Sequence, residues 1–245
     1  MITLIGGSAH PRLAAAVAAQ LHIDLAEVDV AAYPDARVVR LHTSVQGADV
    51  FILQSMPAPS EVHLFELLLL ADAARRAGAR RITAVVPFLG YSRQDRRAAG
   101  ERTAIGARVM ADAISPRVDR VVTVDLHQPA VEGFFAVPVD HLESYPVLLA
   151  ALAETPRNSV VVAPDLGAAK LADRVANALD LPFAVVHKSR TSGVDVAATR
   201  VTGDVAGRRP IVVDDMITTG STVHAAKPGR DVPARRQLRS VRRAA

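Results

Sequence analysis

The sequence predicts an α/β protein with mostly parallel sheets, and three observations support that prediction. Short β-branched runs alternate with alanine-rich amphipathic segments along most of the 245 residues, an alternation typical of βαβ units. The β-branched runs are continuously apolar, as in strands that are buried on both faces. Half of the residues are hydrophobic, which is enough for a sizeable core.

Seven short runs rich in valine or isoleucine are the expected strands. They are Ile2–Ile5, Val50–Leu53, Ile82–Val86, Val121–Val124, Val160–Ala163, Phe183–Val186 and Ile211–Val213. The clearest helix pattern covers residues 60–79, where Ser60 is expected to cap the start and Gly78 to end the helix. The periodicity predicts a face made of Val62, Phe65, Leu68, Leu69 and Ala73.

The strand–helix pattern occurs twice, which predicts two domains, residues 1–145 and 146–226. The boundary falls near Ser144–Pro146, and no linker rich in Gly or Ser separates the domains, so we expect them to pack closely. Residues 227–245 form a basic tail with no strand pattern and with two prolines that break helices. We expect this tail to be disordered.

Composition argues against several classes of protein. Cysteine is absent, so disulfides and thiolate metal sites are impossible, which suits a reducing compartment. The N-terminus lacks the features of a signal peptide. The most apolar helical stretch is too short and too charged to span a bilayer. We therefore expect a soluble cytoplasmic protein that does not bind membranes.

The net charge of +4 hides a contrast between the body of the chain and its tail. The tail holds seven basic side chains and one acidic side chain, so residues 1–226 carry a net charge of −2. No aromatic residue in the tail offers a stacking platform for bases. We do not expect nucleic acid as a partner, although a tail that binds nucleic acid or membranes is the alternative interpretation.

Polar residues that follow the expected strands are the candidate ligand residues, because parallel sheets bind ligands at the carboxyl ends of their strands. Asp214 and Asp215 follow the last strand. The next loop contains Thr218, Thr219, Gly220, Ser221 and Thr222. Backbone N–H groups and hydroxyls in such a loop bind phosphate, while the carboxylates suit sugar hydroxyls or a hard cation. A phosphorylated ribose meets every part of this site, and an acidic strand end before a capped helix is the alternative.

Two other strand ends carry groups of similar chemistry. In residues 90–101, Arg93 and two further arginines crowd around Gln94. Guanidinium groups bind phosphate in a bidentate way, and the amide can contact a base or a ribose. A solvated turn is the alternative there. His127 follows the next strand and is either a metal ligand or a satisfied interior histidine.

The second domain supplies an acid and two cations in the same way. Asp165 follows the strand that ends at Ala163, and it either binds a ligand or caps the next helix. Lys188 and Arg190 follow the next strand, and the region as far as Thr199 is typical of a loop. Two cations on a mobile segment indicate a lid over developing negative charge, whereas an ordinary basic loop is the alternative.

In this order the motifs resemble those of ribose-phosphate pyrophosphokinases, also called phosphoribosyl pyrophosphate synthetases. The most specific motifs are GYSRQDRR, TVDLH and VDDMITTGST, and the resemblance covers residues 1 to about 226. Further matching stretches are VRLHTSVQGADVFILQS, VVAPDLGAAK, HKSR and TGDVAGR. The resemblance implies two tandem type I phosphoribosyltransferase-like domains with the active site between them.

The resemblance also implies an activity and a homo-oligomer. The diphosphoryl group of ATP would pass to C1 of ribose 5-phosphate, giving phosphoribosyl pyrophosphate and AMP, with Mg²⁺ as cofactor. Lys188 and Arg190 would be catalytic, while His127 and Asp165 would place Mg²⁺. The residues implied to bind ATP are Asp35, Arg37, Arg93 and Gln94. Those implied to bind ribose 5-phosphate are Arg190, Asp214, Asp215, Thr218, Thr219, Gly220, Ser221 and Thr222.

The chain departs from the family pattern at three places. The loop that meets adenine reads Tyr33-Pro34-Asp35-Ala36-Arg37 in place of Phe-Ser-Asp-Gly-Glu, and an arginine cannot accept a hydrogen bond from the adenine amino group. The phosphate loop has one glycine instead of two, and the tail replaces the strands that complete the family's second sheet. Two alternatives therefore stay open: a weak or inactive homologue that acts as a regulatory or binding subunit, and a phosphoribosyltransferase.

Overall fold

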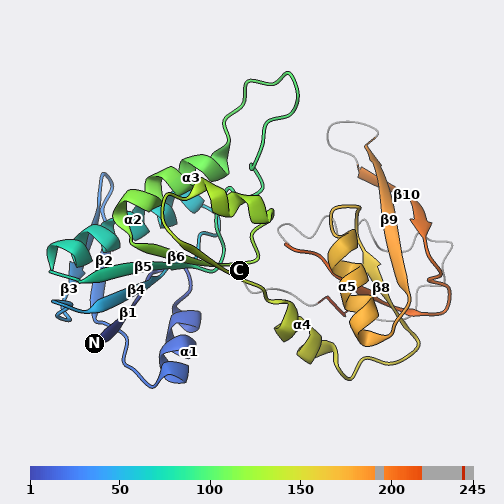
Figure 1. The fold of residues 1–245 in the computed structure, drawn as a ribbon, viewed down its shortest axis with the longest axis horizontal. Coiled ribbons are helices and arrows are strands. Elements are labelled where there is room, and N and C mark those ends of the chain that lie inside the picture. The colour runs from blue at the N-terminus through green and yellow to red at the C-terminus, as the bar shows by residue number, and fades with distance from the viewer. Residues whose placement is uncertain (191–195, 217–238, 241–245) are drawn as a thin grey trace. The chain divides into compact units, whose positions relative to one another are not determined.

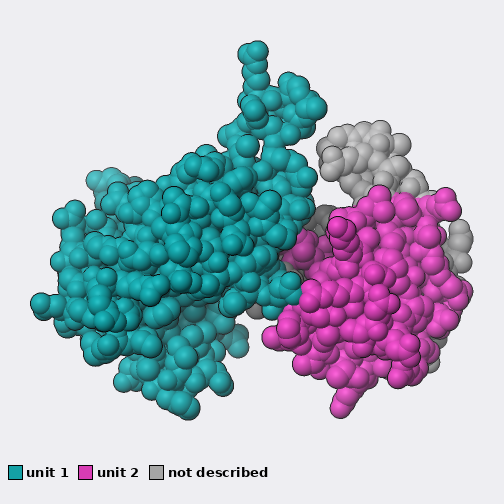
Figure 2. Space-filling model, viewed as in Figure 1, with its two compact units in different colours: residues 1–143, 245 teal, residues 144–244 magenta. Residues whose placement is uncertain are grey.

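A computed structural model describes residues 1–190, 196–216 and 239–240, and it divides the chain into two compact units. Unit 1 comprises Met1–Glu143 and unit 2 comprises Ser144–Ala244 (Figure 2). Each unit has its own sheet and its own hydrophobic clusters.

Unit 1 is built on a five-stranded sheet in the order β1-β4-β5-β6-β7, and all neighbours are parallel. The strands are β1 (Ile2–Gly6), β4 (Asp49–Leu53), β5 (Arg81–Val86), β6 (Arg120–Val124) and β7 (Val139–Leu142). The helices are α1 (Pro11–Leu21), α2 (Ser60–Arg76) and α3 (Gly106–Ile114), with 3-10 turns η1 (Ser115–Arg117) and η2 (Pro129–Phe134). A separate antiparallel hairpin is formed by β2 (Val28–Ala32) and β3 (Arg37–Leu41).

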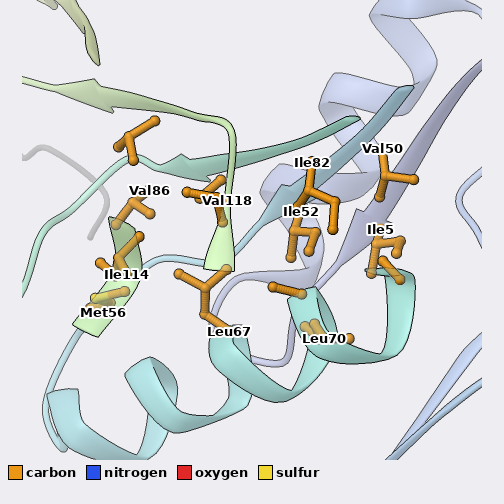
Figure 3. Packing of buried hydrophobic residues seen from close by; sticks show 14 of the residues in the cluster. Ile5, Val50, Ile52, Met56, Leu67, Leu70, Ile82, Val86, Ile114 and Val118 are labelled. Carbon is orange, nitrogen blue, oxygen red and sulfur yellow. The ribbon is translucent and has the colours of Figure 1, made fainter. Parts of the chain in front are cut away.

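The sheet of unit 1 is covered on both faces, with α2 and α3 on one side and α1 on the other (Figure 1). Alternate residues of one strand serve the two faces, as the pleat of a strand requires. On β1, Ile5 packs in the main cluster with Leu67 and Leu70 of α2 (Figure 3). The preceding Leu4 packs with Ala14 of α1 instead. This two-sided burial explains why the strands are continuously apolar.

Unit 2 is built on a mixed sheet in the order β10-β9-β8-β11-β12. Its strands are β8 (Ser159–Ala163), β9 (Phe183–Arg190), β10 (Val196–Thr202), β11 (Arg209–Val212) and β12 (Arg239–Ser240). Its helices are α4 (Tyr145–Leu152) and α5 (Ala169–Leu179). Only the β9–β10 pair is antiparallel among these described strands. Both units therefore confirm the predicted α/β class with mostly parallel sheets.

Each of the seven expected strands is present to within a few residues, but the expected face of α2 is wrong. The buried residues of this helix are Glu66, Leu67, Leu70, Ala71 and Ala74. Phe65, placed on the face from its spacing, is 56% exposed. The run of four leucines is apolar all round, so its spacing fits two faces equally well, and packing against the sheet selects the other one.

The expected cap of α2 is also wrong. Helix α2 has no side-chain cap, and the Ser60 hydroxyl donates backward to the Met56 carbonyl at 2.9 Å. The end of the helix matches the prediction, because Gly78 follows the last turn with a φ of 84°, a conformation that glycine adopts without strain.

Several strands escape prediction from sequence because they are polar or short. The β2–β3 hairpin and β7 each contain charged residues, so no continuous apolar run marks them. The region up to Thr199, expected as a loop, contains β10 from Val196 onward, while residues 191–195 lie outside the described part. In the tail, Arg239–Ser240 pairs with β11, so the absence of a strand was wrongly expected there. The rest of residues 227–245 lies outside the described chain.

The observed buried face of α2 predicts that two nearby truncations lower the free energy of unfolding by different amounts. We expect Leu67→Ala to lower the free energy of unfolding by about 2–5 kcal/mol, because Leu67 is fully buried in the core. Phe65→Ala should change it by roughly 0.5 kcal/mol or less, since the ring is largely exposed. Urea unfolding of the two variants measures both values. Equal losses would contradict the observed helix face.

Candidate functional site

In unit 2, Asp165 and Asp214 come to the same edge of the sheet because their strands are parallel neighbours. β8 and β11 pair in register from Arg209 opposite Ser159 to Val212 opposite Val162. Asp165 follows the end of β8 and Asp214 follows the end of β11. Parallel strands end at a common edge, so the two carboxylates meet there together with Asp215.

Asp214 lies partly buried among like charges at this edge, and its pKa is raised. Burial raises this pKa from the ordinary value of 3.8 to about 7, helped by a hydrogen bond with Asp215 and by the negative charges of Asp215 and Asp165. The Asp215 backbone N–H, which donates to Asp214 Oδ1 at 3.0 Å, opposes the shift only in part. Such an edge suits a cation or a donor hydroxyl.

Asp165 has a local structural task as well. Its Oδ1 accepts backbone N–H groups from Gly167 at 2.9 Å and Ala168 at 3.3 Å, just before α5 begins. These bonds hold the turn before α5, but the helix itself has no side-chain cap, so the interpretation of Asp165 as its cap is wrong. The negative charge of the carboxylate also raises the pKa of Asp214, so this local role and ligand binding are compatible.

Lys188 and Arg190 lie within a strand, which corrects the expectation of a loop. β9 continues to Arg190 because it pairs antiparallel with β10, with Lys188 opposite Ala198 and Arg190 opposite Val196. The apolar run that predicted this strand ends earlier, at Val186. The second half of β9 is polar, so the sequence pattern did not predict it. The phosphate loop Thr218, Thr219, Gly220, Ser221 and Thr222 lies outside the described residues.

In unit 1, Arg93 and Gln94 lie on the segment between β5 and α3, part of which projects from the body of the unit (Figure 1). Gln94 is anchored at the base of the projection: its N–H donates to the Tyr91 carbonyl at 2.8 Å, and its own carbonyl accepts from Ala107 at 3.1 Å. Arg93 is exposed and, within the described residues, forms no ion pair. The geometry leaves its guanidinium accessible for an anionic ligand.

The β2–β3 hairpin holds Asp35 and Arg37 in very different environments. Asp35 is exposed in the turn, which is closed by a hydrogen bond of 2.7 Å from Tyr33 N to the Ala36 carbonyl. The Arg37 guanidinium instead forms an ion pair with Glu66 of α2, whose side chain is 0% exposed. Arg37, which the resemblance assigns to ATP, is thus bound to its own unit.

Glu66 also holds the turn after β1, a role that the sequence did not reveal. Its carboxylate accepts from the Ser8 backbone N–H at 2.7 Å and from the Ser8 hydroxyl at 2.6 Å. Together with Arg37, these donors satisfy a carboxylate that would otherwise be very costly to bury. The available signal was one acid inside the apolar run LFELLLL.

His127 lies in the turn after β6 and is partly buried. Asp125 begins this turn with a φ of 48°, in the left-handed region. The Leu126 backbone N–H donates to Nε2 of His141 on β7 at 2.9 Å. His127 belongs to unit 1, whereas Asp165, its expected partner in placing Mg²⁺, belongs to unit 2.

The described residues hold neither a self-contained metal site nor a membrane-spanning helix. No three His, Asp or Glu side chains among them gather closely enough to hold a metal ion unaided. None of the helices that can be described has the length and apolar character needed to cross a membrane.

Each of the two units matches a known domain family. Residues 148–229 match a phosphoribosyl transferase domain, and residues 2–116 match the N-terminal domain of ribose phosphate pyrophosphokinase. Ribose-phosphate pyrophosphokinase of Vibrio parahaemolyticus is 46% identical over 224 residues, covering 90% of this chain and 71% of that protein. The Mycobacterium bovis protein of the same name is 43% identical over 232 residues, covering 92% and 71%.

A solved structure agrees with these matches. The phosphoribosylpyrophosphate synthetase from Mycobacterium smegmatis superimposes with a TM-score of 0.83 at 39% identity, covering 92% of this chain and 74% of that one. The chain therefore belongs to the ribose-phosphate pyrophosphokinase family of enzymes, and the resemblance of its motifs is confirmed.

The ion pair of Glu66 predicts that Arg37 contributes to the stability of unit 1. We expect Arg37→Met to lower the free energy of unfolding by about 2–3 kcal/mol, because a buried carboxylate loses its counter-charge. Arg40→Met is the control, since Arg40 is exposed on the same strand. Urea unfolding compares the two variants, and a loss no larger for Arg37 than for Arg40 would argue against the anchoring role.

The raised pKa of Asp214 predicts that Asp214→Asn increases the free energy of unfolding by an amount that depends on pH. The carboxyl loses its proton at about pH 7 in the folded state but near pH 3.8 in the unfolded state. It therefore destabilises the protein increasingly from about pH 4 to pH 7, and fully above that. We expect the variant to be more stable than the natural protein by about 1 kcal/mol at pH 8, after allowance for solvent screening, and equal to it at pH 4. Asp173→Asn, on the surface of α5, should show no such trend in urea unfolding between these pH values.

Proposed function

We propose that this protein transfers the diphosphoryl group of ATP to the C1 hydroxyl of ribose 5-phosphate, giving phosphoribosyl pyrophosphate and AMP. The C1 oxygen forms a bond to the β-phosphorus as the bond between that phosphorus and the α–β bridging oxygen breaks. AMP leaves with the electron pair, and the hydroxyl proton is released. Catalysis of such a transfer needs mainly positioning and neutralisation of charge.

The observation that carries this proposal is the acidic edge of unit 2, where Asp165, Asp214 and Asp215 come together. Asp214 and Asp215 would accept hydrogen bonds from the ribose hydroxyls, because their excess negative charge favours donors. The loop Thr218–Thr222, which follows in the sequence, would bind the 5-phosphate through its backbone N–H groups and hydroxyls. The match of residues 148–229 to a phosphoribosyl transferase domain supports this assignment.

The same edge fits Mg²⁺ as the cofactor. Mg²⁺ usually keeps several waters and takes one or two carboxylates together with substrate phosphates, so it does not need a cage of protein ligands. Asp165, whose Oδ1 accepts from Gly167 and Ala168, lies close enough to Asp214 to raise its pKa, so both carboxylates belong to this edge. We assign Asp165 and His127 to the ion, which would neutralise phosphate charge when bound.

On the nucleotide side we assign Arg93, Gln94 and Asp35 to ATP. The exposed guanidinium of Arg93 suits the phosphates, while the amide of Gln94, at the base of the projecting segment, suits the base or ribose. Arg37 is assigned an indirect role, since its ion pair with Glu66 engages its guanidinium. The match of residues 2–116 to the N-terminal domain of ribose phosphate pyrophosphokinase supports the assignment of nucleotide binding to unit 1.

Lys188 and Arg190 are the proposed catalytic cations. Positive charge next to the transferring β-phosphoryl group would stabilise the charge that develops on its oxygens. Both residues lie in the half of β9 nearest its carboxyl end, which is the end where a parallel sheet binds ligands. We further propose, from the family resemblance, a cytoplasmic homo-oligomer.

The test is a direct product assay with ATP, ribose 5-phosphate and Mg²⁺, in which AMP and phosphoribosyl pyrophosphate are measured together. We expect equal amounts of both products and a loss of at least about 100-fold in kcat for Lys188→Ala. Arg157→Ala is the matched control, because Arg157 precedes β8 at the opposite end of the sheet and pairs with Asp180. It should keep full activity.

The rival functions give different results in the same assay. A folded protein that binds ATP but forms no product would support a regulatory or binding subunit. Formation of base nucleotides from phosphoribosyl pyrophosphate, without use of ATP, would support a phosphoribosyltransferase. Either result would overturn the proposed activity.

A further inference from the structure

The turn that carries His127 is held by a histidine on the neighbouring strand. β6 and β7 are parallel partners, with Thr123 opposite His141 and Val124 opposite Leu142. One residue beyond the end of β6, the Asp125 N–H still donates to the Leu142 carbonyl at 2.9 Å. The next N–H, that of Leu126, donates to Nε2 of His141 at 2.9 Å. A side chain of β7 thus continues the hydrogen bonding after the strand pairing ends.

This bond fixes a turn that is unfavourable by itself. Asp125 adopts a left-handed conformation, which is strained for a residue other than glycine and persists only where the surroundings enforce it. Leu126 is only 7% exposed and belongs to the main core. An amide in this position needs an acceptor, since a buried donor without one is costly. His141 supplies that acceptor.

The geometry also defines the tautomer of His141. A ring nitrogen that accepts a hydrogen bond carries no proton, so the proton of the neutral ring is on Nδ1. The neighbouring Asp140 is bonded elsewhere, to Nη1 of Arg120 at 2.7 and 2.8 Å. The two adjacent side chains of β7 therefore have separate tasks.

We propose that His141 is a positioning residue for nucleotide binding, which it serves by holding the Asp125–His127 turn in the conformation that presents His127. The proposal rests on the assignment of His127 to the Mg²⁺-ATP side of the reaction. Loss of the acceptor would release the turn and displace His127, while unit 2 and its ribose-phosphate site would be unaffected.

The test compares His141→Gln with His141→Met. Gln can place Oε1 near the position of Nε2 and keeps an acceptor, whereas Met has a similar length and lacks a strong one. We expect the Met variant to raise KM for Mg-ATP by about 10-fold or more, with KM for ribose 5-phosphate changed by less than about 2-fold. The Gln variant should recover most of the loss. Asp140→Asn, on the same strand, is the control and should leave both KM values unchanged.

Two measurements on the protein are independent of activity. Long-range ¹H–¹⁵N spectra of the unaltered protein should show His141 protonated on Nδ1 and not on Nε2. Hydrogen exchange should be at least about 10-fold faster for the Leu126 amide in the Met variant than in the Gln variant, with the amides of β4 and β5 unchanged.

The outcomes separate this inference from the proposed function. Protonation on Nε2, or equal exchange at Leu126 in both variants, overturns the role of His141 whatever the activity. An active protein in which Met and Gln variants have the same KM for Mg-ATP also overturns it. An unaltered protein that makes no product refutes the proposed function instead, and the spectra and exchange then decide the positioning role alone.

Discussion

Parallel pairing between strands is the constraint on which the rest of this structure depends. Segments far apart in the sequence, such as Ser159–Ala163 and Arg209–Val212, become neighbours, and their register is fixed by hydrogen bonds. Because parallel partners end at the same edge, the residue type that follows each strand decides the chemistry of that edge. A shift in register by one residue would turn Val161 and Ile211 to the wrong face, so burial of the core also fixes the position of the site.

Two carboxylates illustrate how the same group is structural in one place and available for a ligand in another. Glu66 is fully buried, but the donors of Ser8 and Arg37 satisfy it within the protein. Asp214 is half-buried next to two like charges, and its pKa is raised by burial and by the neighbouring carboxylates. Burial alone does not distinguish them. The difference lies in the neighbours, because donors contact Glu66 whereas Asp214 lies next to other carboxylates, and this is why the unit 2 edge and not Glu66 marks the site.

The sequence predicted the strands that are buried on both faces, and through them the positions of Asp165 and Asp214, because continuous apolar runs leave little choice of structure. It failed where side chains are polar or ambiguous. The four leucines of α2 fit two faces, and packing alone selects Leu67 and Leu70. The second half of β9, with Lys188 and Arg190, depends on pairing with β10, a tertiary contact that no local pattern records. Glu66 and His141 escaped because their partners lie on other elements.

The partners of Glu66 also explain how the chain accommodates an arginine where the family pattern has an acid. An acid at position 37 would lie next to the buried carboxylate of Glu66 unless it turned away, whereas an arginine gains an ion pair there. The Arg37 side chain is 23% exposed, so most of it is withdrawn from solvent. Asp35, two residues earlier, remains exposed in the turn. Arg37 therefore acts as an internal anchor of the hairpin, and any contact that the hairpin makes with a nucleotide would be expected at its tip.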